Sequence, residues 1–276
     1  MSVKIIADSS ADLLNLKNVC FEAVPLKIIT ENEEFVDDKN LDVKLMAEKL
    51  LAYKGKSSSS CPNADDWLNA FENATEIYCI TITGTLSGSY NSACMARQMY
   101  LEKNPSAKVF VFNSLSAGPE MTLIVKKTEE LILQKKSFEE VCGQIQEYSR
   151  NTGLLFMLES MQNFANNGRV RPSVAKMAGI LGIRVVGKAS DKGDLEPLDK
   201  CRGEEKALKA IVKLLKQNGL KNGKVFIAHC FNGGAADALA KLVKKEFNCS
   251  VEISALRGLC TFYAEKGGLL VGYEKF

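Results

Sequence analysis

The sequence has little histidine and no patterned cysteine. His229 is the only histidine, and the nine cysteines are scattered without a C-x-x-C pair. Zinc sites draw their ligands mainly from cysteine and histidine at short, regular spacings, so we do not expect one here. An odd, unpatterned set of cysteines is typical of reduced thiols in a cytoplasm. We therefore expect a cytoplasmic protein with no metal and no cofactor.

Long hydrophobic runs and an excess of one charge are also missing. No apolar segment approaches the length of a membrane span, and residues 1–12 lack the pattern of a signal peptide. The formal net charge is only +3, with the two signs interspersed along the chain. This balance predicts neither a nucleic-acid partner nor stable insertion into a membrane. The 276 residues are enough for two domains or one large one.

One stretch has the pattern of a strand, a glycine-rich turn and a helix. In Ile80–Ala93 a short apolar run ends in small and hydroxyl-bearing residues, and apolar residues then recur at helical spacing. Such a turn points N–H groups and hydroxyls at the space above the helix N-terminus, where the helix dipole favours an anion. The lysine of a Walker loop and the G-x-S-x-G frame of a nucleophile elbow are both missing. Alone, the turn is equally consistent with a connection that binds nothing.

Polar residues follow three predicted strands at the point where each strand ends. Strands alternate with helices in this part of the chain, which predicts a parallel sheet. The carboxyl ends of parallel strands meet at one edge, and ligands of open α/β sheets bind there. We therefore expect an α/β fold, Rossmann-like in its first part, whose polar rim comprises Asp8–Ser10, Thr83–Ser89 and Asn113–Ser116.

Two loops carry groups suited to a ligand or a partner. Gly55–Asn63 contains four consecutive serines before Cys61 and Pro62. Its composition favours a flexible loop, although the proline and a candidate helix N-cap at Asn63 indicate that its end is ordered. The later turn Asn166–Pro172 exposes two arginines, and a solvated basic loop accounts for them as well as a binding role does.

The second part of the chain begins near Thr152. Apolar runs and amphipathic segments alternate again, which divides the sequence into residues 1–151 and 152–276 as two α/β domains. Val174–Leu181 is predicted as a helix of small residues, and Gly267–Tyr273 as a strand that closes the second sheet. No internal repeat or linker is visible.

The ordered set of motifs resembles the DegV family of bacterial fatty-acid-binding proteins, which includes the binding subunit of fatty-acid kinase. Leu86–Ala93 is close to the family's L-S-G-T-Y-x-S-A, and Asp8–Leu13 to D-S-T-A-D-L. Five further fragments follow the family's order, namely Ser59–Pro62 for T-S-Q-P, Asn113-Ser114 for D-S, Gly168–Val170 for G-R-I, Ile183-Arg184 for I-K, and Cys201–Gly203 for a later arginine. The resemblance spans nearly the whole chain.

This resemblance implies a two-domain protein, the second domain with a mixed sheet, that binds a long-chain fatty acid and does no chemistry itself. The carboxylate would lie between the domains and the acyl tail inside the second. Ser59 would take the place of a threonine that donates to the carboxylate, with Ser60 beside it. Ser87 and Gly88 match the family's glycine-rich turn. Two arginines complete the set, Arg202 close to the head group and Arg169 matching a loop arginine associated with the kinase partner.

The sequence departs from the family where a histidine usually reaches the head group. Ungapped alignment puts Tyr263 there, within a residue or two. A phenol can donate a hydrogen bond but carries no positive charge near neutral pH. Cys61, Asn113 and Val185 also replace the family's glutamine, aspartate and proline.

Two other functions use the same residues. A serine hydrolase of acyl esters would use Ser87 as its nucleophile and would need His229 as its base. A binder of a small phosphorylated metabolite would use the glycine-rich turn and would need no apolar tunnel.

Overall fold

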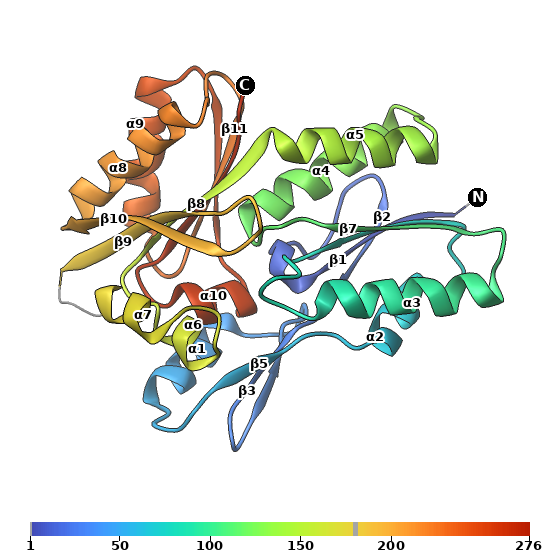
Figure 1. The fold of residues 1–276 in the computed structure, drawn as a ribbon, viewed down its shortest axis with the longest axis horizontal. Helices are drawn as coiled ribbons and strands as arrows, with labels where there is room; N and C mark the ends of the chain where they lie inside the picture. The colour runs from blue at the N-terminus through green and yellow to red at the C-terminus, as the bar shows by residue number, and fades with distance from the viewer. Residues whose placement is uncertain (1, 179–181) are drawn as a thin grey trace.

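The first half of the chain forms a parallel sheet covered by helices. The computed structural model describes residues 2–178 and 182–276. The sheet has the strand order β2-β1-β6-β7, with every neighbouring pair parallel. Its strands are β1 (Val3–Asp8), β2 (Cys20–Val24), β6 (Glu76–Thr81) and β7 (Lys108–Asn113). Its helices are α2 (Ala64–Phe71), α3 (Ser89–Lys103), α4 (Pro119–Leu133) and α5 (Phe138–Arg150), seen to the right in Figure 1.

The second half forms a mixed sheet with the order β10-β9-β8-β13-β11-β12. Only β11 and β12 pair in parallel, and the other neighbours are antiparallel. The strands are β8 (Thr152–Leu158), β9 (Ile183–Ala189), β10 (Leu195–Arg202), β11 (Lys224–His229), β12 (Ser250–Ala255) and β13 (Leu269–Glu274). The helices are α6 (Gln162–Asn166), α7 (Pro172–Ala178), α8 (Glu204–Gln217), α9 (Gly233–Glu246) and α10 (Gly258–Ala264). The predicted α/β fold class is confirmed.

Three expectations for individual elements need correction or restriction. The last strand, β13, does not close the sheet but lies in its middle, between β8 and β11, because its apolar side chains are buried on both faces. The serine loop is not wholly irregular, since Ser58–Ser60 forms β5. Of the helix predicted over Val174–Leu181, residues 179–181 lie outside the described ranges.

A small antiparallel sheet, β4-β3-β5, links the two halves. It comprises β3 (Lys27–Ile29), β4 (Glu34–Val36) and β5, and α1 (Val43–Ala52) follows it. Its apolar face packs against α10, where Ile28, Phe35 and Phe262 share one cluster.

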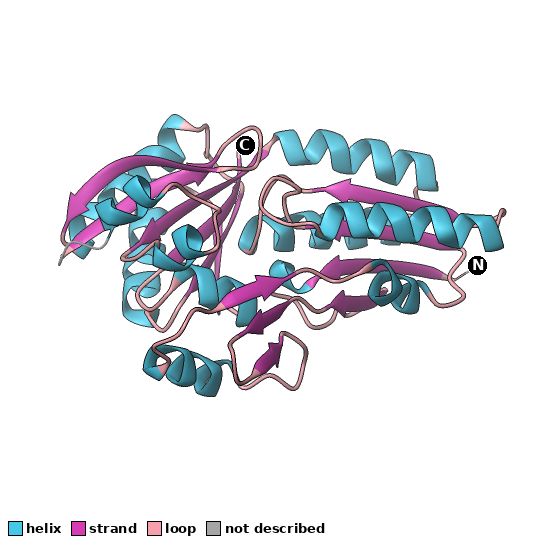
Figure 2. Ribbon diagram, turned by 60° about the horizontal axis from the view of Figure 1, so that its bottom comes forward, coloured by secondary structure: helices cyan, strands magenta, loops and turns pink. Residues whose placement is uncertain are grey.

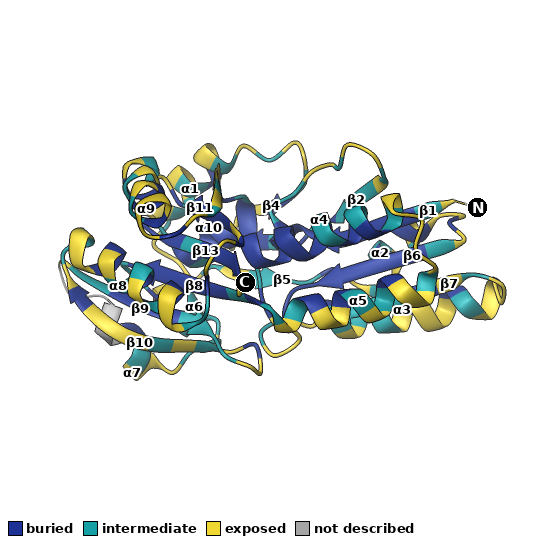
Figure 3. Cartoon of the chain, turned by 90° about the horizontal axis from the view of Figure 1, so that it is seen from above, coloured by how far each residue is buried: buried dark blue, intermediate teal, exposed yellow. Residues whose placement is uncertain are grey.

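Helix α4 also joins the halves, because it contacts strands of both large sheets, including β6 and β13. Figure 3 shows it dark blue along most of its length, in contrast to the exposed outer faces of α3 and α5. The sheets divide between Arg150 and Thr152, yet the buried contacts continue across that division. No described helix has the length and apolarity that crossing a bilayer requires.

Candidate functional site

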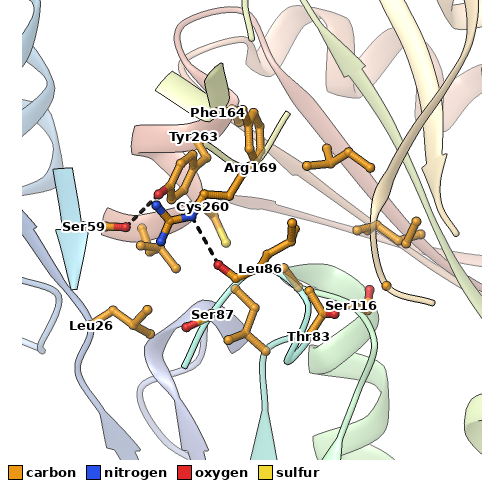
Figure 4. Close-up of a pocket in the computed structure, with 18 of the residues that line it drawn as sticks. Leu26, Ser59, Thr83, Leu86, Ser87, Ser116, Phe164, Arg169, Cys260 and Tyr263 are labelled. Atoms are coloured by element: carbon orange, nitrogen blue, oxygen red, sulfur yellow. Dashed lines mark hydrogen bonds between the residues drawn. The ribbon is translucent and has the colours of Figure 1, made fainter. Parts of the chain in front are cut away.

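A cavity of about 290 Å³ lies where the two halves meet. Its lining combines loops from the ends of the first sheet, strand β5, the β8 side of the second sheet and helix α10. Figure 4 shows hydroxyl-bearing residues and one arginine around it, with apolar side chains between them. The cavity therefore brings together segments that are far apart in the sequence.

The three polar strand ends of the first sheet converge, as the sequence predicts. Asp8 accepts hydrogen bonds from the Ile82 amide at 2.8 Å and from the Ser89 hydroxyl at 2.7 Å. Asn113 Oδ1 accepts from the Gly84 amide at 3.1 Å, which ties the third strand end to the second. Burial raises the pKa of Asp8, and the hydrogen bonds from Ser10 and Ser89 oppose that rise. Asp8 is thus the buried support on which the glycine-rich turn rests.

The glycine-rich turn presents Ser87 and Gly88 to the cavity. Ser87 Oγ accepts from the Ser89 amide at 3.3 Å, and within the described residues its hydroxyl hydrogen has no acceptor. Gly88 is the N-cap of α3 and has no side-chain cap, so the positive end of that helix faces this space. A Cβ atom on Gly88 would lie 3.0 Å from Cys61 Sγ, which explains a glycine where the turn approaches the serine loop. This geometry is suited to an anionic group.

Ser59 and Tyr263 form a second polar group across the cavity. Their hydroxyl oxygens are 2.7 Å apart, and either can be the donor. One hydroxyl hydrogen is used in this bond, so the other is available to a ligand. Burial raises the pKa of Tyr263, and the Ser59 hydrogen bond and Arg169 oppose the rise. The phenol is therefore neutral at physiological pH. Ser60, next in β5, also lines the cavity.

Helix α10, which carries Tyr263, was not predicted because its cap is remote in sequence. The Asp37 carboxylate accepts from the Gly258 and Leu259 amides, each at 2.9 Å, across more than 220 residues. Amides in the first turn of a helix have no acceptor within the helix, and no local side chain caps these two. The tyrosine is then fixed by Phe164, whose ring stacks on it at 4.7 Å between centroids.

Arg169 lies in the wall of the same cavity. Its Nε donates to the Leu86 carbonyl at 3.2 Å and its Nη1 to the Asn167 carbonyl at 2.6 Å. The guanidinium carbon is 5.9 Å from the centre of the Tyr263 ring. In Figure 4 the Arg169 side chain projects between Tyr263 and Leu86. The sequence interpretation, which assigned this arginine to a kinase partner, did not anticipate a position inside the cavity, because no local pattern links Asn166–Pro172 to the glycine-rich turn.

The remaining wall of the cavity is apolar. Successive side chains of a strand point to opposite faces, so alternate residues of β8 face the cavity. The residues between them, Leu155 and Met157, pack instead in the core beneath α8 and α9. The apolar wall comprises Leu154, Phe156, Leu158, Leu195, Leu259 and Leu270. A small phosphorylated metabolite would leave this surface without a partner.

The hairpin between β9 and β10 closes the cavity beside the glycine-rich turn. Thr85 Oγ1 donates to the Lys192 carbonyl at 2.6 Å. Gly193 has a φ of +83°, and a Cβ there would lie 2.1 Å from Thr83 Oγ1. Only glycine allows the hairpin backbone to approach so closely. The polar turn of the first half and the apolar sheet of the second are therefore in direct contact.

Two residues singled out from the sequence lie elsewhere. Arg202 is exposed and does not line the cavity, contrary to the expected place near the head group. It ends β10, seven residues beyond Leu195, and about 3.3 Å per residue puts it roughly 20 Å along the strand. His229, at the end of β11, does not line the cavity either. The one histidine of the sequence is therefore not placed beside Ser87, where a hydrolase would need it as a base.

Comparison with known proteins identifies relatives over the full length. A family model described as "Uncharacterised protein, DegV family" matches residues 2–275. A DegV domain-containing protein of Streptococcus pneumoniae is 44% identical over 279 residues, covering 99% of each chain.

Solved structures are similar over the same extent. A DegV family protein from Eubacterium eligens, loaded with heptadecanoic acid, has a TM-score of 0.98 at 43% identity, with both chains covered completely. The fatty acid kinase (Fak) B3 protein of Streptococcus pneumoniae, loaded with linoleic acid, has a TM-score of 0.98 at 44% identity, again with complete coverage of both chains.

Proposed function

The chain belongs to the DegV family, and from that premise we propose that it binds one long-chain fatty acid in the cavity between its halves. The carboxylate is held by Ser59, Ser60, Ser87, Gly88 and Tyr263, and the hydrocarbon tail lies along the apolar wall. The observation that carries this proposal is a cavity that joins two hydroxyl-bearing loops to the apolar face of β8. Fatty acids bound in the two similar solved proteins support it.

The two walls contribute differently to binding. Burying a methylene group is worth about 0.8 kcal/mol, so a tail of about fourteen methylenes contributes on the order of 11 kcal/mol before the costs of association. A hydrogen bond to a charged group contributes about 1.5–3 kcal/mol, which is set against the desolvation of the carboxylate. The tail therefore supplies most of the affinity, while the hydroxyls orient the acid.

The protein is a carrier in this proposal and presents its acid to a kinase that forms the acyl phosphate. The similarity to the fatty acid kinase B3 protein supports such a partner. We take residues 1–151 and 152–276 as two domains, since each contains its own large sheet. A cytoplasmic location is supported by the nine cysteines, all of which are free thiols.

Native mass spectrometry of the purified full-length protein tests the proposal. We expect an adduct with the mass of a long-chain fatty acid, and we expect the delipidated protein to bind such an acid again in a titration. Protein that carries no lipid and binds none after delipidation would overturn the proposal. Turnover of an acyl ester that disappears in His229→Ala would instead favour the hydrolase.

A further inference from the structure

The outer face of helix α3 is exposed and almost uncharged. From Gly84 to Leu101 the sequence contains one charged residue, although a quarter of the whole chain is charged. The exposed residues of α3 before Glu102 are Asn91, Met95, Arg97, Gln98 and Met99. Helix α8, which has nearly the same length, carries a charged side chain at every exposed position except Gln217. Charged residues normally occupy the solvent side of a helix, so contact with water alone does not account for this face of α3.

Two methionines project from this face of α3. Met95 is 60% exposed and Met99 is 37% exposed. Residues four positions apart lie on the same side of a helix, so the two side chains are neighbours. Protein interfaces are enriched in methionine and depleted of lysine, glutamate and aspartate, and flexible methionine side chains adapt to the surface of a partner. The composition of this face is therefore that of a contact with another protein.

The same face begins beside the opening of the cavity, and we call it the α3 face, comprising Asn91, Met95, Gln98 and Met99. Gly88, the N-cap of α3, lines the cavity and is also exposed. Figure 1 shows α3 running outward from the region where the two halves meet. At about 1.5 Å per residue, Met99 lies roughly 15 Å along the helix from Ser89. A protein that reaches the head group past Gly88 would therefore contact the α3 face.

The lack of charge also limits the class of partner. Nucleic acids bind to clustered lysine and arginine, and helices that lie on anionic membranes carry these residues on their polar face. Arg97 is the only cation of α3 before Lys103, and its Nε donates to the Val109 carbonyl at 2.8 Å. The α3 face therefore fits a protein whose own contact surface is apolar and largely uncharged.

We propose that the kinase docks on the α3 face when it reaches the carboxylate of the bound fatty acid. Its apolar side chains pack against Met95 and Met99, and its surface covers the opening at Gly88. This inference rests on the proposed function and adds the place on the chain at which the partner binds.

The test measures how well the kinase uses the loaded full-length protein as a substrate. The probe is the catalytic subunit of the fatty acid kinase of Streptococcus pneumoniae, whose B3 protein is 44% identical to this chain, with ATP and protein loaded with palmitic acid. We expect Met95→Glu to raise the KM for the loaded protein at least about tenfold, because it puts a charge into the apolar contact. Its affinity for palmitic acid should change less than about twofold, because Met95 does not line the cavity.

Leu133→Glu is the matched control, and it should behave as the wild type does. It makes the same kind of change at a residue of α4 that is 50% exposed and lies outside the cavity lining. Gln98→Glu, three residues beyond Met95, is the second variant should Met95→Glu not fold. It adds a charge to the α3 face without removing an apolar side chain, so it should raise the KM by a smaller factor.

An unchanged KM in Met95→Glu and Gln98→Glu, or an equal rise in Leu133→Glu, overturns the inference. Wild-type protein of twice the chain mass that Met95→Glu converts to single chains also overturns it, because the α3 face then binds a second copy. Wild-type protein that binds palmitic acid but gives no acyl phosphate with the kinase overturns this inference and leaves fatty-acid binding in place. Protein that binds no palmitic acid overturns the proposed function as well.

Discussion

The two walls of the cavity are built in different ways. The polar wall consists of loop residues held by hydrogen bonds between neighbouring strand ends, with Asp8 buried beneath them. The apolar wall consists of alternate residues of a strand, whose other face is buried in a separate core. The contribution of the polar wall to binding depends on a few hydrogen bonds of defined geometry. The contribution of the apolar wall depends on the total apolar surface area that the ligand buries. Single substitutions should therefore act sharply on the first wall and gradually on the second.

The largest effect should come from shortening the ligand, which removes contacts with the apolar wall. At about 0.8 kcal/mol per methylene, each carbon removed should weaken binding about fourfold, and eight carbons about 5 × 10⁴-fold. Titration of the delipidated protein with saturated acids of decreasing length measures this slope. Equal affinity for short and long acids would mean that the head group alone determines binding.

Removing the support of the polar wall should reduce stability. Asp8→Ala leaves the Ile82 amide and the Ser89 hydroxyl without their buried acceptor, at a cost of about 3 kcal/mol in the free energy of unfolding. Asp8→Asn keeps one acceptor oxygen and should lose less. Denaturant unfolding of both variants checks the order. Stability equal to wild type in Asp8→Ala would show that the three strand ends do not depend on this residue.

Loss of one hydroxyl from the polar wall should weaken the binding of the carboxylate head group and leave the contribution of the hydrocarbon tail unchanged. Ser87→Ala should weaken binding of a fatty acid about tenfold, because one hydrogen bond to a charged group is removed. The loss per carbon on shortening the acid should stay as in the wild type. Ser92→Ala, a serine of the following helix α3 that lies outside the cavity lining, is the control. A change in the chain-length slope of Ser87→Ala would contradict the separation of the two walls.

The smallest effect concerns the buried contact between the halves. Burial raises the pKa of Asp12 to about 8, and the neighbouring Asp37 acts in the same direction. The folded state therefore holds a proton that the unfolded state releases near pH 4, and the stability linked to it is lost as pH rises toward 8.

The asparagine of Asp12→Asn has no such proton to release. It keeps a side-chain oxygen that can accept the hydrogen bond that the Arg257 amide donates to Asp12 at 3.0 Å. Its free energy of unfolding relative to wild type should rise between pH 5 and 8 by at least about 1 kcal/mol, since one pKa unit corresponds to about 1.4 kcal/mol. Asp191→Asn, at an exposed position, should show no such trend. Parallel pH profiles for Asp12→Asn and wild type would be inconsistent with a buried, protonated Asp12.

Features with local causes could be predicted from the sequence, and those with remote causes could not. The convergence of the strand ends follows from parallel strands and polar tips, so the polar rim that includes Thr83–Ser89 could be predicted from the pattern. Ser87 and Gly88 were singled out within it by the family resemblance. Strand β5 and helix α10 depend on distant partners, since Ser59 pairs with Ile28 and Asp37 caps α10. Arg202 was misplaced because motif order carries no information about distance along a strand. Arg169 was assigned to a kinase partner, and its place in the cavity wall could not be predicted because its turn meets Leu86 only in the folded protein.

A crystal structure of the protein with a bound long-chain fatty acid tests the central claim most directly. We expect the carboxylate within hydrogen-bond distance of Ser87 and of the Ser59–Tyr263 pair, with the hydrocarbon against Phe156 and Leu158. Density for the acid in another pocket, or a chain that points its methyl end at Ser87, would contradict the account.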